Sequence, residues 1–76
     1  MSKPIETVYA AFGMRIRVIR ETIGLSQSEL AKVVGLTRTS IVNIEAGRQR
    51  ILLHHVEKFA KAFNTNAKHM MKGIWT

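Results

Sequence analysis

Residues 27–46 read QSELAKVVGLTRTSIVNIEA and contain two short helical patterns separated by a glycine. The apolar positions at helical spacing are Leu30, Ala31, Val34, Ile41 and Ile44. Gly35 supplies a tight turn between the two patterns, and Leu36 plugs the gap beneath that turn. Two short helices joined in this way cross at a steep angle, which requires a small residue where their backbones approach. Ala31 is that residue, so this stretch predicts two crossing helices.

Capping signals mark the ends of both helices. Ser26 and Glu29 match the S-x-x-E capping box, in which each side chain bonds the backbone N–H of the other residue. Thr37 is a suitable N-cap for the next helix, and Gly47 supplies the left-handed residue that closes it. The sequence therefore predicts one helix that ends at Gly35 and another, about ten residues long, that ends at Gly47.

Helical periodicity predicts three further helices. One begins near Pro4 and stops at Gly24, another covers about residues 53–63 before Asn64, and a short one follows the cap Asn66. Their apolar faces comprise, in chain order, Phe12, Ile16, Ile19 and Ile23; Val56, Phe59, Ala60 and Phe63; and Ala67, Met70, Met71 and Ile74. No stretch alternates with period two for long enough to be a strand. The expected fold class is all-α, with five helices.

Length and composition narrow the class of protein. The 76 residues suffice for one domain over residues 1–76, and the absence of cysteine excludes disulfides, cysteine-zinc sites and thiol nucleophiles. The longest charge-free stretch, residues 7–14, is far shorter than the roughly 20 apolar residues of a membrane span. Pro4 and Glu6 interrupt the region where a secretory signal would be apolar. We therefore expect a cytoplasmic protein with no membrane association.

The charge balance indicates the chemistry of the partner. Twelve Lys and Arg against five Asp and Glu give a net charge of +7, while the apolar content of 46% is that of a folded domain. Such a cationic module favours an anionic partner, and nucleic acid is the first candidate.

The motifs occur in an order that resembles the Xre-type helix-turn-helix family, the DNA-binding domains of phage repressors and Cro proteins. The resemblance covers residues 14–73 and rests on GLSQ at 24–27, NIEAGR at 43–48 and the segment 64–73. It implies a five-helix repressor-like domain, with the helix-turn-helix at about 27–46 and helices four and five at about 53–73. A small helical bundle without DNA-binding activity would need the same apolar framework, so the function must come from the exposed residues.

The outward face of the third helix carries candidate base-reading residues. With Ile41 and Ile44 inward, that face and its first turn present Thr37, Arg38, Thr39, Val42 and Asn43, without a carboxylate. The Arg38 fork can bond guanine O6 and N7, Asn43 can pair with adenine N6 and N7, and methyl groups can contact thymine. The resemblance implies base contacts from Thr37, Arg38, Thr39 and Asn43. The competing interpretation for each is solvated surface.

A second set of residues is suited to bind DNA phosphates, which positions the protein without reading sequence. The set comprises Ser26, Gln27, Ser40, Arg48 and Arg50. The resemblance implies phosphate contacts from Ser26 and Gln27 at a helix N-terminus and from the two arginines after the third helix, and Ser40 can bond phosphate or base. Alternatively, Gln27 only helps to cap its helix and the arginines are solvated.

One charged pair is expected to be structural. The resemblance implies that Arg20 and Glu45 form a partly buried salt bridge between the first and third helices. From the sequence alone, Arg20 can equally contact a phosphate.

A single recognition helix covers only about four or five base pairs, too few to discriminate against a genome of competing sites. We therefore expect a homodimer on an inverted-repeat operator, with recognition helices about 34 Å apart. The resemblance implies a dimer contact around the fifth helix, and the expected interface residues are Asn66, Met70, Ile74 and Trp75. Alternatively, Trp75 folds back on the first helix.

No enzymatic, cofactor or metal site is expected. His54 and His55 should point about 100° apart on a helix, and His69 is separate, so no ligand cluster results. Longer phage repressors of the family carry a second, self-cleaving domain, and for a complete protein of these 76 residues we expect a Cro-like or short control protein instead.

The predicted function is that of a dimeric repressor, and activation through contact with RNA polymerase stays open. The alternatives are a protein-interaction module, such as an antitoxin of a toxin–antitoxin pair or a transcriptional adaptor, and a non-specific coating protein, against which the asymmetric face of the third helix argues.

Overall fold

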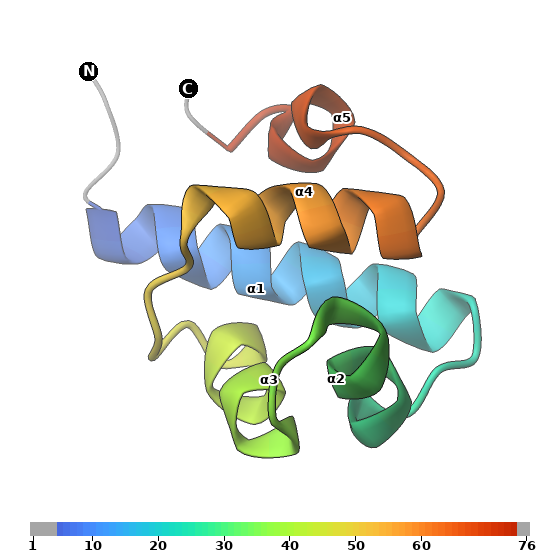
Figure 1. The fold of residues 1–76 in the computed structure, drawn as a ribbon. Coiled ribbons are helices and arrows are strands. Elements are labelled where there is room, and N and C mark those ends of the chain that lie inside the picture. Colours follow the sequence, from blue (N-terminus) through green and yellow to red (C-terminus); the bar gives the residue numbers. More distant parts are fainter. Residues whose placement is uncertain (1–4, 75–76) are drawn as a thin grey trace.

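The computed structural model describes residues 5–74, which form five α-helices and no strand within that range. The helices are α1 (Ile5–Thr22), α2 (Gln27–Val34), α3 (Arg38–Glu45), α4 (Leu53–Ala62) and α5 (Ala67–Met71). Figure 1 shows α2 and α3 on one side of α1 and α4, with α5 on the opposite side. The predicted all-α fold with its helix-turn-helix is thereby confirmed. None of the helices in residues 5–74 is long and apolar enough to cross a membrane.

The turn between α2 and α3 has the predicted local chemistry. Ser26 and Glu29 form both bonds of the capping box, at 3.0 Å from the Glu29 N–H to the Ser26 hydroxyl and 2.8 Å in return. Gly35 adopts a left-handed conformation with φ of 72°, and the N–H groups of Gly35 and Leu36 both donate to the Ala31 carbonyl. The left-handed Gly35 and these short-range hydrogen bonds therefore end α2 and turn the chain toward α3.

A single apolar core lies between the five helices. Its buried members are Val8, Phe12, Ile16, Leu30, Ala31, Val34, Ile41, Ile44, Phe59, Ala60, Met70 and Ile74. The rings of Phe12 and Phe59 meet edge to face, with centroids 6.3 Å apart, and thereby join α1 to α4. The five apolar residues expected at helical spacing in the helix-turn-helix are all buried, and Leu36 beneath the turn is half-buried against the core.

The expected dimer contact by Met70 and Ile74 is wrong. Their exposed fractions are 0% and 2%, because α5 packs these side chains against the rest of the same chain. They belong to the core, and they have no surface to offer a second copy. Asn66 is exposed, and its side-chain oxygen accepts a bond from the His69 N–H and so caps α5. Trp75 lies outside the described residues.

Two smaller expectations about helix faces are also wrong. Ile23 is 50% exposed because α1 ends at Thr22, before the helix can carry Ile23 against a neighbour. Arg20, four residues after Ile16 and in line with it, is the last side chain of α1 to be buried. Ala67, at the start of the short helix α5, is exposed.

Gly13 marks a close approach of α1 and α3 that the sequence analysis did not detect. A Cβ atom at Gly13 would lie 2.0 Å from the carbonyl oxygen of Ile44. Only glycine therefore permits this backbone contact, although glycine weakens a helix interior. Helix α3 therefore lies directly against the backbone of α1.

Candidate nucleic-acid interface

A buried ion pair connects α1 to α3. Arg20 Nε and Nη2 donate to the two carboxylate oxygens of Glu45 at 2.6 and 3.0 Å, and both side chains are at least nine-tenths buried. Arg20 Nη1 also donates to the Leu25 carbonyl at 2.8 Å. The hydrogen bonds from Arg20 to Glu45 are the main reason that the pKa of Arg20 is raised. The Arg20 guanidinium is thus committed to this contact inside the protein, as the resemblance implied, and it is not presented to a phosphate.

Gln27 extends this network to the start of α2. Its Nε2 donates to Glu45 Oε1 at 3.2 Å, so one carboxylate holds side chains from both α1 and α2. Ser26, the neighbouring candidate for phosphate contact, is exposed, and its hydroxyl caps α2. The first turn of α2 and the body of α3 are therefore fixed relative to each other by hydrogen bonds, in addition to apolar packing.

The candidate base-reading residues lie on the outward face of α3, away from its buried residues Ile41 and Ile44. Thr37, Arg38 and Thr39 are exposed at its first turn, and Val42 and Asn43 are half-buried one turn later. The Thr37 hydroxyl accepts a bond from the Ser40 N–H at 3.0 Å and lies 3.2 Å from the Ser40 hydroxyl. Thr37 and Ser40 therefore help to start α3, whereas Arg38 and Thr39 are free of such a role in the described contacts.

The electrostatics of this face suit a polyanion. Glu45 is the only acidic residue of α3, and it points inward, where Arg20 neutralises it. Glu29 is engaged in the capping box, and the hydrogen bond from the Ser26 backbone is the main reason that its pKa is lowered. No exposed carboxylate therefore stands on α3 to repel phosphates.

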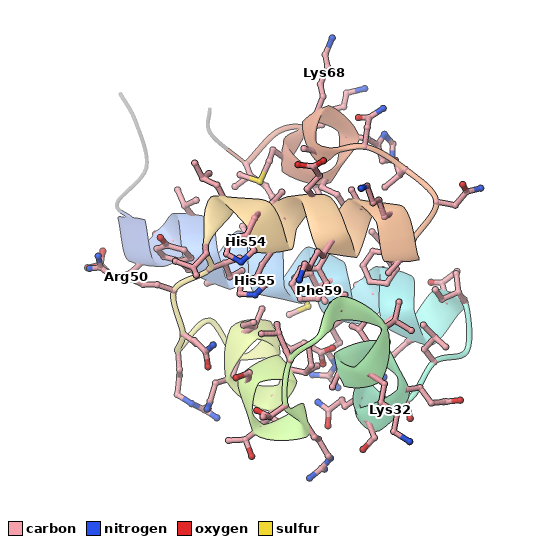
Figure 2. All side chains as sticks on the ribbon, in the orientation of Figure 1. Lys32, Arg50, His54, His55, Phe59 and Lys68 are labelled. Carbon is pink, nitrogen blue, oxygen red and sulfur yellow. The ribbon has the colours of Figure 1, made fainter. Side chains whose placement is uncertain are left out.

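Two arginines follow α3, and the structure gives them different surroundings. The guanidinium of Arg48 bonds the side-chain oxygen of Asn43, with Nε at 3.3 Å and Nη2 at 3.2 Å. Arg50 is exposed and points outward from the loop between α3 and α4 (Figure 2). Asn43 and Arg48, which were expected in separate roles, thus contact each other.

The arrangement of the histidines differs from the expectation. The rings of His54 and His55 lie side by side, with centroids 4.3 Å apart, so the expectation that they point well apart is wrong (Figure 2). Their χ angles, which helical spacing does not fix, bring the rings together. Within residues 5–74, however, no three His, Asp or Glu side chains are grouped to hold a metal ion. Burial, followed by the charges of His54 and Lys58, lowers the pKa of His55.

Arg15 has a structural role that the sequence did not reveal. Its Nη1 donates to the carbonyl oxygens of Met70 and Lys72 at 2.9 and 2.6 Å. These two bonds tie the end of α5 to α1, on the side of the molecule away from α3 (Figure 1). Arg15 contributes to the net positive charge that suggests DNA binding, but in the structure its side chain stabilises the fold.

Comparison with known proteins places the chain in a family. The helix-turn-helix family model matches residues 16–68. An uncharacterised HTH-type transcriptional regulator of Archaeoglobus fulgidus is 39% identical over 56 residues, which are 74% of this chain and 80% of the relative. The restriction-modification controller protein C.AhdI from Aeromonas hydrophila superposes with a TM-score of 0.77 at 32% identity, over 82% of this chain and 94% of the controller. The biofilm master regulator SinR, solved in complex with DNA, superposes with a TM-score of 0.74 at 26% identity, over 80% of this chain and 98% of SinR. This chain therefore belongs to the Xre-type helix-turn-helix family of DNA-binding transcriptional regulators.

Proposed function

We propose that this protein represses transcription by binding an operator in double-stranded DNA, with α3 inserted in the major groove. The observation that carries the proposal is the outward face of α3, which presents Arg38, Thr39 and Asn43 and no carboxylate. A groove about 12 Å wide admits one α-helix, and these side chain types can distinguish base edges there. Arg38 is the strongest candidate, because its guanidinium is exposed and can make two bonds to guanine.

Residues on both sides of α3 are suited to position it. Ser26 and Gln27 lie at the amino end of α2, where backbone N–H groups favour an anion. Arg50 lies on the loop after α3 and is free to contact phosphate. The shared carboxylate of Glu45 keeps the start of α2 and α3 in one arrangement, so the protein meets DNA with its contacts already in place. Such preorganisation supports a sequence-specific function more than a non-specific coating.

We also propose that the operator is an inverted repeat bound by a homodimer. One α3 reads too few base pairs for specificity, and a two-fold dimer places two such helices about 34 Å apart. Lys68 of α5 and Lys72 directly after it are exposed, so a contact made by this segment alone would bring cations together across a two-fold axis. Met14 and Val18 of α1 are more than half exposed and line an open groove beside His69 and Lys72. They offer the apolar surface that a dimer contact at this end requires.

The dimer surface is tested by Val18→Glu, with Val33→Glu as a matched control at an exposed position of α2. Sedimentation equilibrium should report a monomer for Val18→Glu and a dimer for the control. A dimer in both variants would remove Val18 from the interface.

The likeness to C.AhdI supports a short control protein as the biological type. That likeness spans nearly the whole controller, which is known as a regulator of restriction-modification. In such a role the operator would overlap a promoter, and occupancy alone would block transcription or, through contact with RNA polymerase, assist it. We expect no catalytic activity and no cofactor requirement.

Selection of bound duplexes from a random DNA library tests the function. The expected result is an enriched inverted repeat with half-sites one helical turn apart, bound at least about 10³-fold more tightly than its scramble. Affinity that is equal for all sequences and only decreases with salt would overturn the proposal. Co-purification of a second small protein in that case would favour the protein-interaction alternative.

A further inference from the structure

We infer that Arg48 is a specificity-determining residue that acts through Asn43, by fixing which end of the Asn43 amide faces DNA. The inference rests on the proposed function and deepens it. Its basis is the bond from the Arg48 guanidinium to Asn43 Oδ1, which two N–H groups make at 3.3 and 3.2 Å.

The helix end that precedes Arg48 builds this contact. Gly47 takes a left-handed conformation with φ of 75° and thereby reverses the chain at the end of α3. The backbone N–H of Arg48 then donates to the backbone carbonyl of Asn43 at 2.9 Å. Because main chain and side chain of Arg48 both bond to Asn43, the arginine is held over that residue in the free protein.

The chemistry of the pair fixes the orientation of the amide. A guanidinium has only donors, so Asn43 must turn its oxygen toward Arg48 and not its nitrogen. The two N–H groups converge on that oxygen, which has two lone pairs, and therefore leave little capacity for a further donor. The part of the amide that stays available to DNA is the NH₂ group.

This orientation changes the base that Asn43 should read. Adenine offers the N6 donor and the N7 acceptor in the major groove, so bidentate reading by asparagine needs both amide ends. An amide that presents donors alone suits an edge with acceptors alone, namely O6 and N7 of guanine or O4 of thymine. We therefore replace the expectation that Asn43 pairs with adenine by a preference for guanine or thymine at that position, imposed by Arg48.

Library selection on four proteins tests this inference: the unaltered protein, Asn43→Ala, Arg48→Ala and Arg50→Ala. The base pair that Asn43 reads is the one at which Asn43→Ala loses its preference. The unaltered protein should select guanine or thymine there, and Arg48→Ala should shift the preference toward adenine by about threefold to tenfold, the range for one exposed hydrogen bond. Arg50→Ala, which removes the same charge two residues later, should weaken binding to all sequences alike.

Two outcomes would overturn the inference. One is selection of adenine at this position by the unaltered protein, and the other is an effect of Arg48→Ala that is uniform over sequences, as for a phosphate contact. The double variant Asn43→Ala/Arg48→Ala should have the same preference as Asn43→Ala alone, because Arg48 acts through Asn43. If the unaltered protein selects no sequence at all, the proposed function itself fails, which is distinct from both outcomes. In the free protein, NMR should detect greater mobility of the Asn43 side-chain amide in Arg48→Ala, and unchanged mobility would also contradict the inference.

Discussion

Replacing Gly13 with alanine tests the backbone contact between α1 and α3. The added Cβ would lie 2.0 Å from the Ile44 carbonyl oxygen, 3.0 Å from its carbon and 3.1 Å from the Glu45 carbonyl oxygen. Real Cβ atoms essentially never lie closer than 3.0 Å to such neighbours, so α3 must withdraw from α1 by about 1 Å. The atoms that obstruct the Cβ are backbone atoms, which a rotamer change cannot move aside.

Two opposing effects set the magnitude. Alanine is a better helix former than glycine by about 1 kcal/mol, so the local effect of the substitution is stabilising. Overpacking against fixed backbone costs about 1–3 kcal/mol and at times more, and this displacement also stretches the Arg20–Glu45 bond, which spans the same two helices at 2.6 Å. We expect a net loss of about 2 kcal/mol in the free energy of unfolding. For a domain of this size that lowers Tm by about 10 °C.

Thermal unfolding followed by circular dichroism measures this change, with Thr7→Ala as the control at an exposed position of the same helix. The control should leave the stability unchanged or slightly raised. A Gly13→Ala protein that is more stable by about 1 kcal/mol, as helix propensity alone requires, would refute the close contact of α1 and α3.

Three further predictions concern the ion pair, the recognition face and a titrating histidine. Glu45→Ala should lower the free energy of unfolding in urea by about 3 kcal/mol, because it leaves the Arg20 charge buried without its partner. The control Glu57→Ala, at an exposed site, should lower it by less than about 0.5 kcal/mol, and equal losses would contradict the role of the pair. Arg38→Ala should lose about 1–3 kcal/mol of discrimination at one operator base pair. The control Lys68→Ala removes the same charge on the side of the molecule away from α3 (Figure 2), and it should keep full discrimination. Anisotropy titrations on matched and mismatched duplexes measure both variants. The pKa of His55 is below its ordinary 6.5, chiefly through burial, so the contribution of His55 to stability is complete above pH 6.5 and is lost as the pH falls through the lower folded pKa. In His55→Asn, the free energy of unfolding should therefore depend less on pH between 7.5 and 5. An unchanged pH dependence would exclude His55 as the source of this loss of stability.

The helices and turns were predictable because each depends on neighbours in the chain. The capping box of Ser26 and Glu29 and the left-handed turns at Gly35 and Gly47 all involve hydrogen bonds between residues at most five positions apart. The predicted end of the fourth helix at about residue 63 differs by only one residue from the observed Ala62. Such local signals predict the ends of helices independently of how the rest of the chain packs.

The candidate site was only partly predictable. Spacing placed Arg38, Thr39 and Asn43 on the outward face of α3, since the inward positions of Ile41 and Ile44 fix the rotation of that helix. Spacing did not reveal that Arg48 bonds the Asn43 side chain, because that contact depends on the rotamers of both side chains after a chain reversal. It also assigned no structural role to Arg15, whose partners lie 55 and 57 residues away.

The sequence by itself determined the all-α class, the helix-turn-helix and the cationic, cysteine-free surface, because helix propensity, capping and charge are properties of short segments. The tertiary structure alone decided which apolar and charged side chains are covered. Met70 and Ile74 are apolar residues of the kind found in interfaces, yet they belong to the core because α1 and α4 lie against α5. Gly13 has a low helix propensity, yet glycine is required at this position because the backbone of α3 contacts it. Burial depends on elements that are distant along the chain, and no local sequence pattern encodes which of these elements will pack against a given side chain.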